Sequence, residues 1–387
     1  MTEPAEIGVY VHWPYCARIC PYCDFNVVRD RGDGAAQAAL ARAILTDLTA
    51  QAERLGRRRL VSLFFGGGTP SLMAPESVAQ IVAAARTLFE AAPDLEVTLE
   101  ANPTDAEAGR FASLAEAGVN RLSLGVQSLD DAALAFLGRN HDAAEARRAA
   151  EIAGRAFARL SLDLIYARPG QSLTAWRAEL AEALALGAEH VSAYQLTLEP
   201  GTPFDRAVAR GRWAPPGDDL AAGLFETTQD VLGDAGFEAY EVSNHARGAA
   251  ARSRHNLIYW RGGDYLGVGP GAHGRITGPD GARWATLTAA RIADYVARVE
   301  AAGCGPSERT RLTARETAQE RLLMGLRTVE GVARAELAAL ALDPAVTEAL
   351  VAAGLLATPH QRLVATDAGR RVLDRVVLEL ANGANAG

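Results

Sequence analysis

Three of the four cysteines in this sequence lie close together near its start. Cys16, Cys20 and Cys23 have the spacing C-x3-C-x2-C, and Cys304 lies far from them along the chain. A cubane iron–sulfur cluster is normally held by one Cys thiolate per iron. Three thiolates on one short loop would leave one iron free to bind a small molecule. The loop therefore predicts a metal centre with an open coordination position.

Two other uses of the cysteines have to be weighed. Structural zinc takes four ligands, often in paired short spacings, and no second C-x2-C pair follows in this sequence. His12 could complete a zinc site, but its place in a predicted strand favours a position in the wall of a cavity. A disulfide framework needs a dense, even set of cysteines, which this chain lacks. The cluster is the favoured interpretation and zinc the alternative.

Short apolar runs alternate with longer amphipathic runs through the first half of the chain. This alternation predicts six strands, each followed by a helix. Right-handed βα units place the strands inside and the helices outside, and six units rather than eight predict an α/β fold with a partial, open (β/α)6 TIM-like barrel. The predicted strands are 7–12, 60–65, 95–100, 121–126, 160–166 and 190–197, and the predicted helices are 35–55, 75–90, 105–117, 130–137, 143–157 and 174–186.

Unusual residues fall where the predicted strands end. The Cys loop follows the first strand, a Gly-Gly-Gly-Thr-Pro segment (66–70) follows the second, Glu100 ends the third, and Asp163 lies in the fifth. In βα barrels, catalytic and binding residues lie at the carboxyl ends of the strands, which together form one rim of the barrel. The glycines could form only a tight turn, or could let backbone approach a ligand. The two acids could be satisfied by backbone donors, or could bind a ligand amine or ribose hydroxyls. Their common rim favours a ligand site.

Several segments carry a family resemblance. The cysteine loop, with Tyr22 before its last cysteine, and the GGGTP segment resemble the radical S-adenosylmethionine (SAM) superfamily. The segments YVHWPYC, LSLGVQS, GRNH and DLIY are similar to its oxygen-independent coproporphyrinogen III oxidase-like branch. The resemblance implies a 4Fe-4S cluster on Cys16, Cys20 and Cys23 that binds S-adenosyl-L-methionine at its fourth iron. The residues implied for the SAM pocket are Tyr10, Tyr22, Gly67, Gly68, Thr69, Glu100, Gln127, Arg139 and Asp163.

Two groups within this branch differ around the cysteine loop. Coproporphyrinogen dehydrogenases continue the loop to a fourth cysteine and carry an N-terminal extension that helps to cover the substrate. Here Phe25 stands at the fourth position, and the first predicted strand already begins near Ile7. Both differences disfavour the dehydrogenase group.

A second motif resembles the HemW-like haem chaperones. The segment 255–260 reads HNLIYW and matches an HNxxYW motif that is linked to haem binding in that group. The resemblance implies haem-binding roles for His255, Asn256, Tyr259 and Trp260. Physically, a neutral imidazole is a good axial ligand for haem iron, and the two aromatic side chains offer flat apolar surface. The alternative is that these side chains only pack a surface strand against the barrel.

We expect residues 1–236 to form the radical SAM core, 237–305 an irregular lobe that carries the HNxxYW motif, and 306–387 a C-terminal winged-helix-like α+β accessory domain. The net charge is −8, and the arginines are scattered beside acids, which argues against binding to nucleic acid. The first residues contain neither a basic segment nor an apolar run that could span a membrane. We therefore expect a soluble cytoplasmic protein.

The resemblance implies a haem chaperone with a 4Fe-4S cluster and a SAM site. Such a protein would bind haem, transfer it to acceptor haemoproteins, and make transient contact with membrane-bound haem proteins. We assign no catalytic residue. The main alternative is a coproporphyrinogen III dehydrogenase that cleaves SAM to a radical and decarboxylates its substrate. A DNA-binding regulator that senses through its cluster is disfavoured by the charge distribution.

Overall fold

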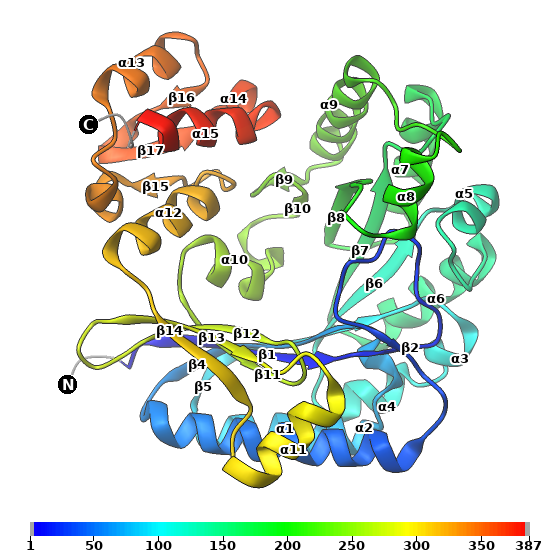
Figure 1. Ribbon diagram of the computed structural model, residues 1–387. Helices are drawn as coiled ribbons and strands as arrows, with labels where there is room; N and C mark the ends of the chain where they lie inside the picture. The colour runs from blue at the N-terminus through cyan, green and yellow to red at the C-terminus, as the bar shows by residue number, and fades with distance from the viewer. Residues whose placement is uncertain (1–3, 384–387) are drawn as a thin grey trace.

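A continuous twelve-stranded sheet organises the part of the chain that the computed structural model describes, residues 4–383. Its order is β14-β13-β12-β11-β1-β4-β5-β6-β7-β8-β10-β9 (Figure 1). The stretch from β1 to β8 is parallel and curls into a partial barrel. The predicted α/β barrel fold is confirmed. Its strands are β1 (Glu6–Trp13), β4 (Arg59–Gly67), β5 (Glu90–Ala101), β6 (Arg121–Gln127), β7 (Arg159–Tyr166) and β8 (His190–Gln195).

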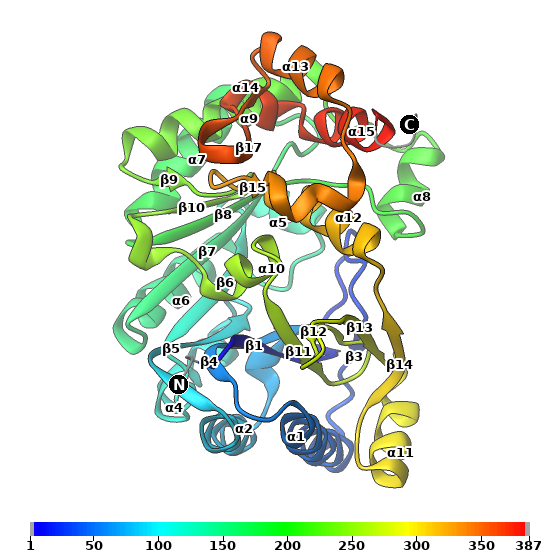
Figure 2. The same cartoon turned by 90° about the vertical axis from the view of Figure 1, so that its left-hand side faces the viewer.

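Helices cover the outer face of these strands (Figures 1 and 2). The helix predicted at 75–90 is too long, because Phe89 is already extended and Glu90 starts β5 beside Arg59. The helix predicted at 105–117 is interrupted around Gly109, a poor helix former. The helices of the barrel are α1 (Gly34–Leu55), α2 (Pro75–Leu88), α3 (Asp105–Ala108), α4 (Phe111–Glu116), α5 (Asp131–Phe136), α6 (Ala143–Ala156), α7 (Leu173–Ala185), α8 (Pro203–Ala209) and α9 (Asp218–Asp234).

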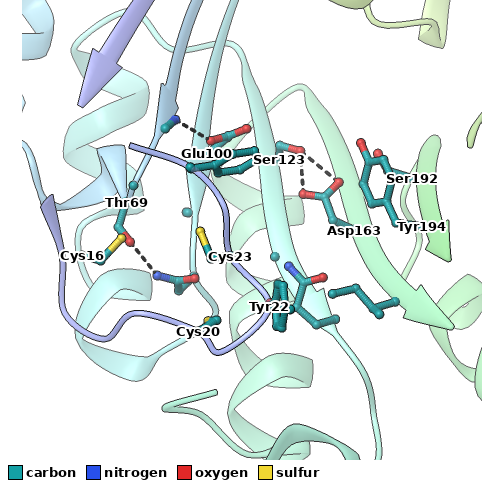
Figure 3. Close-up of a pocket in the computed structure, with 18 of the residues that line it drawn as sticks. Cys16, Cys20, Tyr22, Cys23, Thr69, Glu100, Ser123, Asp163, Ser192 and Tyr194 are labelled. Carbon is teal, nitrogen blue, oxygen red and sulfur yellow. Dashed lines mark hydrogen bonds between the residues drawn. The ribbon is translucent and has the colours of Figure 1, made fainter. Parts of the chain in front are cut away.

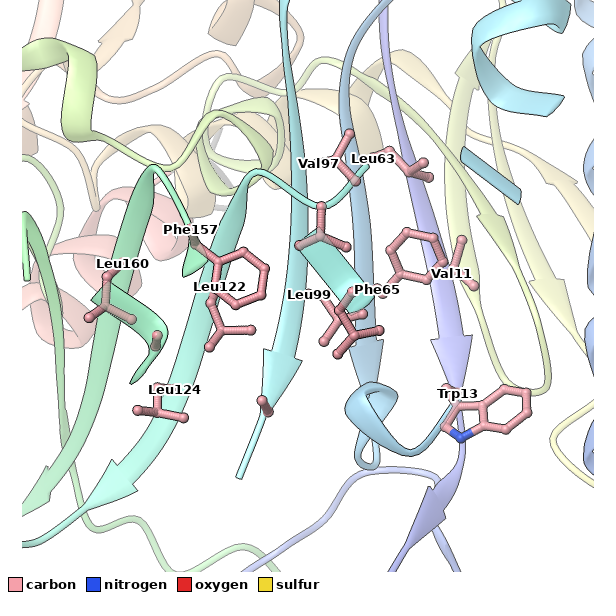
Figure 4. Packing of buried hydrophobic residues seen from close by; sticks show 14 of the residues in the cluster. Val11, Trp13, Leu63, Phe65, Val97, Leu99, Leu122, Leu124, Phe157 and Leu160 are labelled. Carbon is pink, nitrogen blue, oxygen red and sulfur yellow. The ribbon is translucent and has the colours of Figure 1, made fainter. Parts of the chain in front are cut away.

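Side chains along each barrel strand point alternately to the outer, apolar core beneath the helices and to the polar inside of the barrel. On β5, Val97 and Leu99 are fully buried and point to the helices, where they join the main apolar cluster (Figure 4). Thr98 and Glu100 on the same strand face the inside of the barrel, where they line a cavity. Successive side chains of a strand point to opposite faces, so one strand builds both the core and the wall of a site.

The sheet continues past β1, where an irregular lobe was expected. Strand β11 pairs in parallel with β1, and three antiparallel strands follow it. The irregular structure predicted for 237–305 is therefore wrong: short glycine-containing strands gave a weak pattern, and their partner β1 lies at the other end of the sequence. The added elements are β9 (Glu238–Ala239), β10 (Asn244–Ala246), α10 (Arg254–Trp260), β11 (Asp264–Val268), β12 (His273–Thr277), β13 (Arg283–Thr288), α11 (Ile292–Ala302) and β14 (Pro306–Arg311).

The last part of the chain forms a small α+β unit with its own apolar cluster, as the predicted winged-helix-like domain requires. Helix α12 connects this unit to the sheet and contacts α10 (Figure 2). Among the described residues, no helix is long and apolar enough to cross a membrane. The elements are α12 (Ala314–Gly325), β15 (Val332–Ala333), η3 (Arg334–Leu340), α13 (Pro344–Ala352), β16 (Leu356–Ala357), β17 (Arg362–Ala365), α14 (Asp367–Arg371) and α15 (Leu373–Gly383).

Candidate functional site

The three cysteines of the C-x3-C-x2-C loop lie on one excursion of the chain after β1. Two short parallel strands, β2 (Tyr15–Cys16) and β3 (Val28–Arg29), close the loop at its base. The amide of Asp30 donates to the carbonyl of Cys16 over 2.8 Å and fixes the closing end. The loop is thus a closed unit at the rim of the barrel.

All three cysteine side chains line a cavity of about 440 Å³ at the carboxyl ends of the parallel strands (Figure 3). This is the rim where the sequence predicted a ligand. Tyr10 is the exception among the predicted pocket residues, because it lines a neighbouring cavity. Its hydroxyl group is hydrogen-bonded to Nδ1 of His12. The predicted SAM residues that do line the cavity are Tyr22, Gly67, Gly68, Thr69, Glu100, Gln127, Arg139 and Asp163.

A guanidinium group stands directly beside the cysteine loop. Nη1 of Arg139 lies 3.3 Å from Sγ of Cys20 and 3.5 Å from the hydroxyl of Tyr22. Its other amino group donates to the side chain of Asn102 and to the carbonyl of Gly125. A fixed cation next to sulfur favours the thiolate form, which is the form that binds metal. Arg139 is therefore placed to assist a metal centre on this loop.

Burial favours the protonated form of the Cys16 and Cys23 thiols in the metal-free chain. Desolvation raises the pKa of Cys16 to about 11, although a hydrogen bond with Thr69 opposes the shift. Burial also raises the pKa of Cys23. A bound metal reverses this tendency, because its charge deprotonates a coordinating thiol outright. The donor set thus suits a metal that binds with release of protons.

The arrangement of the sulfur atoms suits a cluster. Among the described residues, no three Cys, His, Asp or Glu side chains are grouped closely enough to hold one metal ion. A cubane cluster needs each thiolate at a different iron, so its ligands have to surround a common space rather than meet at one point. All three cysteines line one cavity, and His12 is engaged elsewhere, with Nε2 2.8 Å from the carbonyl oxygen of Asn26.

Two carboxyl groups, those of Glu100 and Asp163, face the same cavity, and within residues 4–383 neither has a basic partner at hydrogen-bond distance. Burial, together with the charge of Asp163, raises the pKa of Glu100 to about 8. Burial likewise raises the pKa of Asp163 to about 6, against hydrogen bonds from Ser192 and Ser123. The hydroxyl of Ser123 donates to both oxygens of Asp163, over 3.2 and 3.0 Å (Figure 3). A cationic ligand in the cavity would stabilise the ionised form of these two acids.

The glycine segment has a packing role that the sequence did not reveal. The amide of Gly67 donates to Glu100 over 3.1 Å, that of Gly68 to the carbonyl of Trp13 over 2.7 Å, and that of Thr69 to the carbonyl of Tyr15 over 2.8 Å. A Cβ on Gly68 would lie 2.7 Å from the carbonyl oxygen of Tyr15. These three N–H groups are therefore paired within the chain, and the predicted approach of this backbone segment to a ligand stays a prediction.

The four residues of the HNxxYW motif come together at a second cavity, of about 680 Å³. The motif forms helix α10 rather than the surface strand considered above, and Ser253 caps its first turn. His255 is buried: its Nδ1 lies 2.9 Å from the hydroxyl of Ser62 and its Nε2 2.7 Å from that of Tyr259. Asn256 lines both cavities.

The two cavities adjoin each other. Their shared wall includes Phe64 and Glu100, which project from neighbouring strands, and Phe25 at the mouth, whose side chain is 61% exposed. Further shared residues are Asp24, Gly67 and Asn256. A ligand in one cavity therefore lies against the same side chains as a ligand in the other.

Comparison with known proteins identifies the family. The model of the radical SAM superfamily matches residues 10–183. The heme chaperone HemW of Escherichia coli (strain K12) is 40% identical to this chain over 284 residues, which cover 73% of each chain. The chain belongs to the HemW family of radical SAM proteins. The resemblance predicted from its motifs is confirmed.

Other relatives of this HemW-family chain extend the comparison. The mitochondrial radical S-adenosyl methionine domain-containing protein 1 of Bos taurus is 47% identical over 71% of this chain. The match spans 62% of that relative's length, which is less than two thirds. The solved coproporphyrinogen III oxidase HemN from Escherichia coli shares 19% identity with a TM-score of 0.80, over 98% of this chain and 90% of that chain. At this identity the likeness shows a common fold.

Sequence reasoning missed several residues at the two cavities of this HemW-family protein. Asn102 links the rim by donating to Thr69 over 3.0 Å and accepting from Arg139. Its position directly after β5 was a usable signal. Most of the far wall of the second cavity carried no such signal, because it comes from strands of the unrecognised sheet extension and from helix α12. Its residues include Tyr265, His273, Arg275, Arg283, Thr317, Glu320 and Met324.

Proposed function

We propose that this protein is a haem chaperone, which binds haem and passes it to acceptor haemoproteins. The observation that carries the proposal is the second cavity, where Tyr259 and Trp260 of the HNxxYW motif meet further aromatic side chains beside the cysteine cavity. Its volume of about 680 Å³ lies within the range of about 300–1,000 Å³ typical of small-molecule sites. The family relationship to a heme chaperone supports the same function.

The proposal includes a 4Fe-4S cluster on Cys16, Cys20 and Cys23 and SAM beside it. The cluster supplies an open iron and one-electron chemistry when it is bound. The chain's own part is to hold the thiolates with the closed loop and to keep the guanidinium of Arg139 next to Cys20. Glu100 and Asp163 would attract the positive charges of SAM, and the polar lining of the barrel would orient its ribose.

Two features favour haem transfer over decarboxylation of coproporphyrinogen III. The cysteine loop has Phe25 where dehydrogenases of this branch carry a fourth cysteine. The cavity beside it is walled by aromatic side chains of α10, which suit a flat macrocycle. The cluster would then support or regulate transfer instead of driving turnover. A cytoplasmic location and contact with membrane-bound acceptors stay predictions.

The test uses the full-length protein after anaerobic reconstitution of its cluster. We expect haem to bind with a shifted Soret band and to move to an apo-haemoprotein that is added in excess. Incubation with SAM, a reductant and coproporphyrinogen III is expected to give no protoporphyrinogen IX above background. Formation of protoporphyrinogen IX would establish the dehydrogenase instead. Failure to bind haem at all would rule out the chaperone.

A further inference from the structure

The second cavity has a chemical division between its two sides. One side is aromatic and lies between α10 and the barrel strands. A second part of the lining comes from β12, β13 and α12 and is mostly polar, and it adjoins the aromatic part where Tyr265 pairs with Arg275. A flat apolar ligand with charged substituents would find a suitable surface on each side. The aromatic side consists of Tyr10, Phe64, His255, Tyr259, Trp260 and Tyr265.

Two of the three histidines that line this cavity have both ring nitrogens engaged. His12 lies 3.1 Å from the hydroxyl of Tyr10 through Nδ1 and 2.8 Å from the carbonyl of Asn26 through Nε2. His255 contacts the hydroxyls of Ser62 and Tyr259 in the same way, and its ring stacks on Phe64 with 4.6 Å between centroids. Neither imidazole presents a free lone pair to the cavity.

The third histidine, His273, is different. It begins β12, its side chain is exposed, and within residues 4–383 neither of its ring nitrogens has a hydrogen-bond partner. Partial burial and the charge of Arg275 lower its pKa, which keeps the imidazole neutral near pH 7. A neutral imidazole with an unoccupied nitrogen is the form that binds iron.

Charged groups next to His273 suit the carboxylates of a porphyrin. His273 and Arg275 are two residues apart on β12, so they project from the same face of the strand. Arg283 of β13 lines the same cavity. Glu320 on α12 accepts from Arg275 over 2.8 Å, which places one acid among these guanidinium groups. A ligand carboxylate could share or replace that contact.

Resting on the proposed haem function, we propose that haem occupies the second cavity and that His273, rather than His255, supplies an imidazole ligand to its iron. The HNxxYW residues then form the wall against the porphyrin face, and Arg275 and Arg283 lie near its propionates. In this arrangement His255 acts as a positioning residue for Tyr259 and Phe64. The iron lies on the side of the cavity that opens to solvent, where an acceptor protein can reach it.

The test compares ferric haem with metal-free protoporphyrin IX as probes of the full-length protein. We expect His273→Ala to weaken the binding of ferric haem at least about tenfold and to change the Soret band and the EPR spin state of the bound haem. Protoporphyrin IX should bind as tightly as before. The matched control is His360→Ala, which removes an exposed histidine from the C-terminal unit and should leave both ligands unaffected. Met324→Trp narrows the cavity and should weaken the binding of both ferric haem and protoporphyrin IX.

Each other outcome overturns a defined part of the proposal. An unchanged haem spectrum in His273→Ala removes the ligand assignment. Equal weakening of haem and protoporphyrin IX by that substitution makes His273 a wall residue only. Unaltered binding in Met324→Trp removes the cavity assignment. Failure of the wild-type protein to bind haem overturns the proposed function as well, so the two failures are told apart.

Discussion

Nε2 of His255 lies 2.7 Å from the hydroxyl oxygen of Tyr259. The two residues are four apart on helix α10, the spacing at which helical side chains face each other. The spacing of the HNxxYW motif is therefore also the spacing of an internal hydrogen bond. In this chain, His255 and Tyr259 of the motif are hydrogen-bonded to each other in the wall of the second cavity.

This pairing predicts a cost for losing the tyrosine hydroxyl. Tyr259→Phe leaves a buried ring nitrogen of His255 without a partner, which should lower the free energy of unfolding by about 1–3 kcal/mol. The measurement is urea unfolding followed by circular dichroism. Tyr265→Phe is the control, because Tyr265 also lines the cavity but no hydroxyl hydrogen bond ties it to the described residues. Equal stability of the two variants would contradict the structural role of the pair.

The cluster prediction concerns iron content. Replacing Cys16, Cys20 or Cys23 with Ala should abolish the brown absorption and the iron content of about four per chain that a cubane cluster brings. Cys304→Ala should retain both, because Cys304 is buried away from the loop and lies 2.9 Å from Nη1 of Arg54. Iron analysis after anaerobic reconstitution decides. Loss of iron in Cys304→Ala would show that three ligands are not enough.

Glu100 predicts a specific dependence of stability on pH. Its pKa is about 8 in the folded chain, against about 4.3 in an unfolded one. Between these values the folded state holds a proton that the unfolded state has released. The free energy of unfolding of the metal-free protein should therefore fall as the pH rises from 5 to 8, with a contribution on the order of 2 kcal/mol from this cavity-facing group.

Glu100→Gln removes the ionisable group and should flatten this fall. The control is Glu116→Gln, which changes an exposed glutamate outside the cavity and should keep the wild-type slope. Denaturant unfolding at pH 5, 6, 7 and 8 measures all three proteins. Parallel profiles for the wild type and Glu100→Gln would mean that Glu100 is ionised throughout this range.

The glycine segment gives a prediction with an internal comparison. Gly67 has a φ of +111°, and a Cβ there would lie 2.5 Å from Cε1 of His12. Gly67→Ala should therefore destabilise the protein by at least about 2 kcal/mol. Gly154 lies exposed within α6, with open space around its Cα, so Gly154→Ala should stabilise by about 0.5–1 kcal/mol. Thermal unfolding of both variants tests the contrast, and similar changes in both would contradict it.

The barrel was predictable from sequence because its signals are local. Buried strands such as the one predicted at 60–65 are short apolar runs, and their order along the chain is also their order in the sheet from β4 to β8. The rim followed from the same reasoning, since parallel strands bring their carboxyl ends together. This placed Glu100, Asp163 and the cysteines at one cavity.

The second cavity was not predictable in the same way. It depends on the parallel pairing of β1 with β11, between residues at opposite ends of the barrel sequence, and on α12 packing near α10. The segment Asp264–Val268 contains a glycine and gives little periodic signal. The engagement of His255 was also invisible, because its partner Ser62 comes from another strand and only the folded chain brings the two together.

The pairing of β1 with β11 also determines which truncated forms of the chain can stay monomeric. Residues Ile7 to Val11 bond to β11 along their whole length, in register with Asp264 to Val268. A chain cut between 236 and 264 would expose β1 as an unprotected edge strand with an apolar sequence. Such edges recruit strands from other molecules. The isolated barrel should therefore self-associate, and β11 acts as its built-in protection against aggregation.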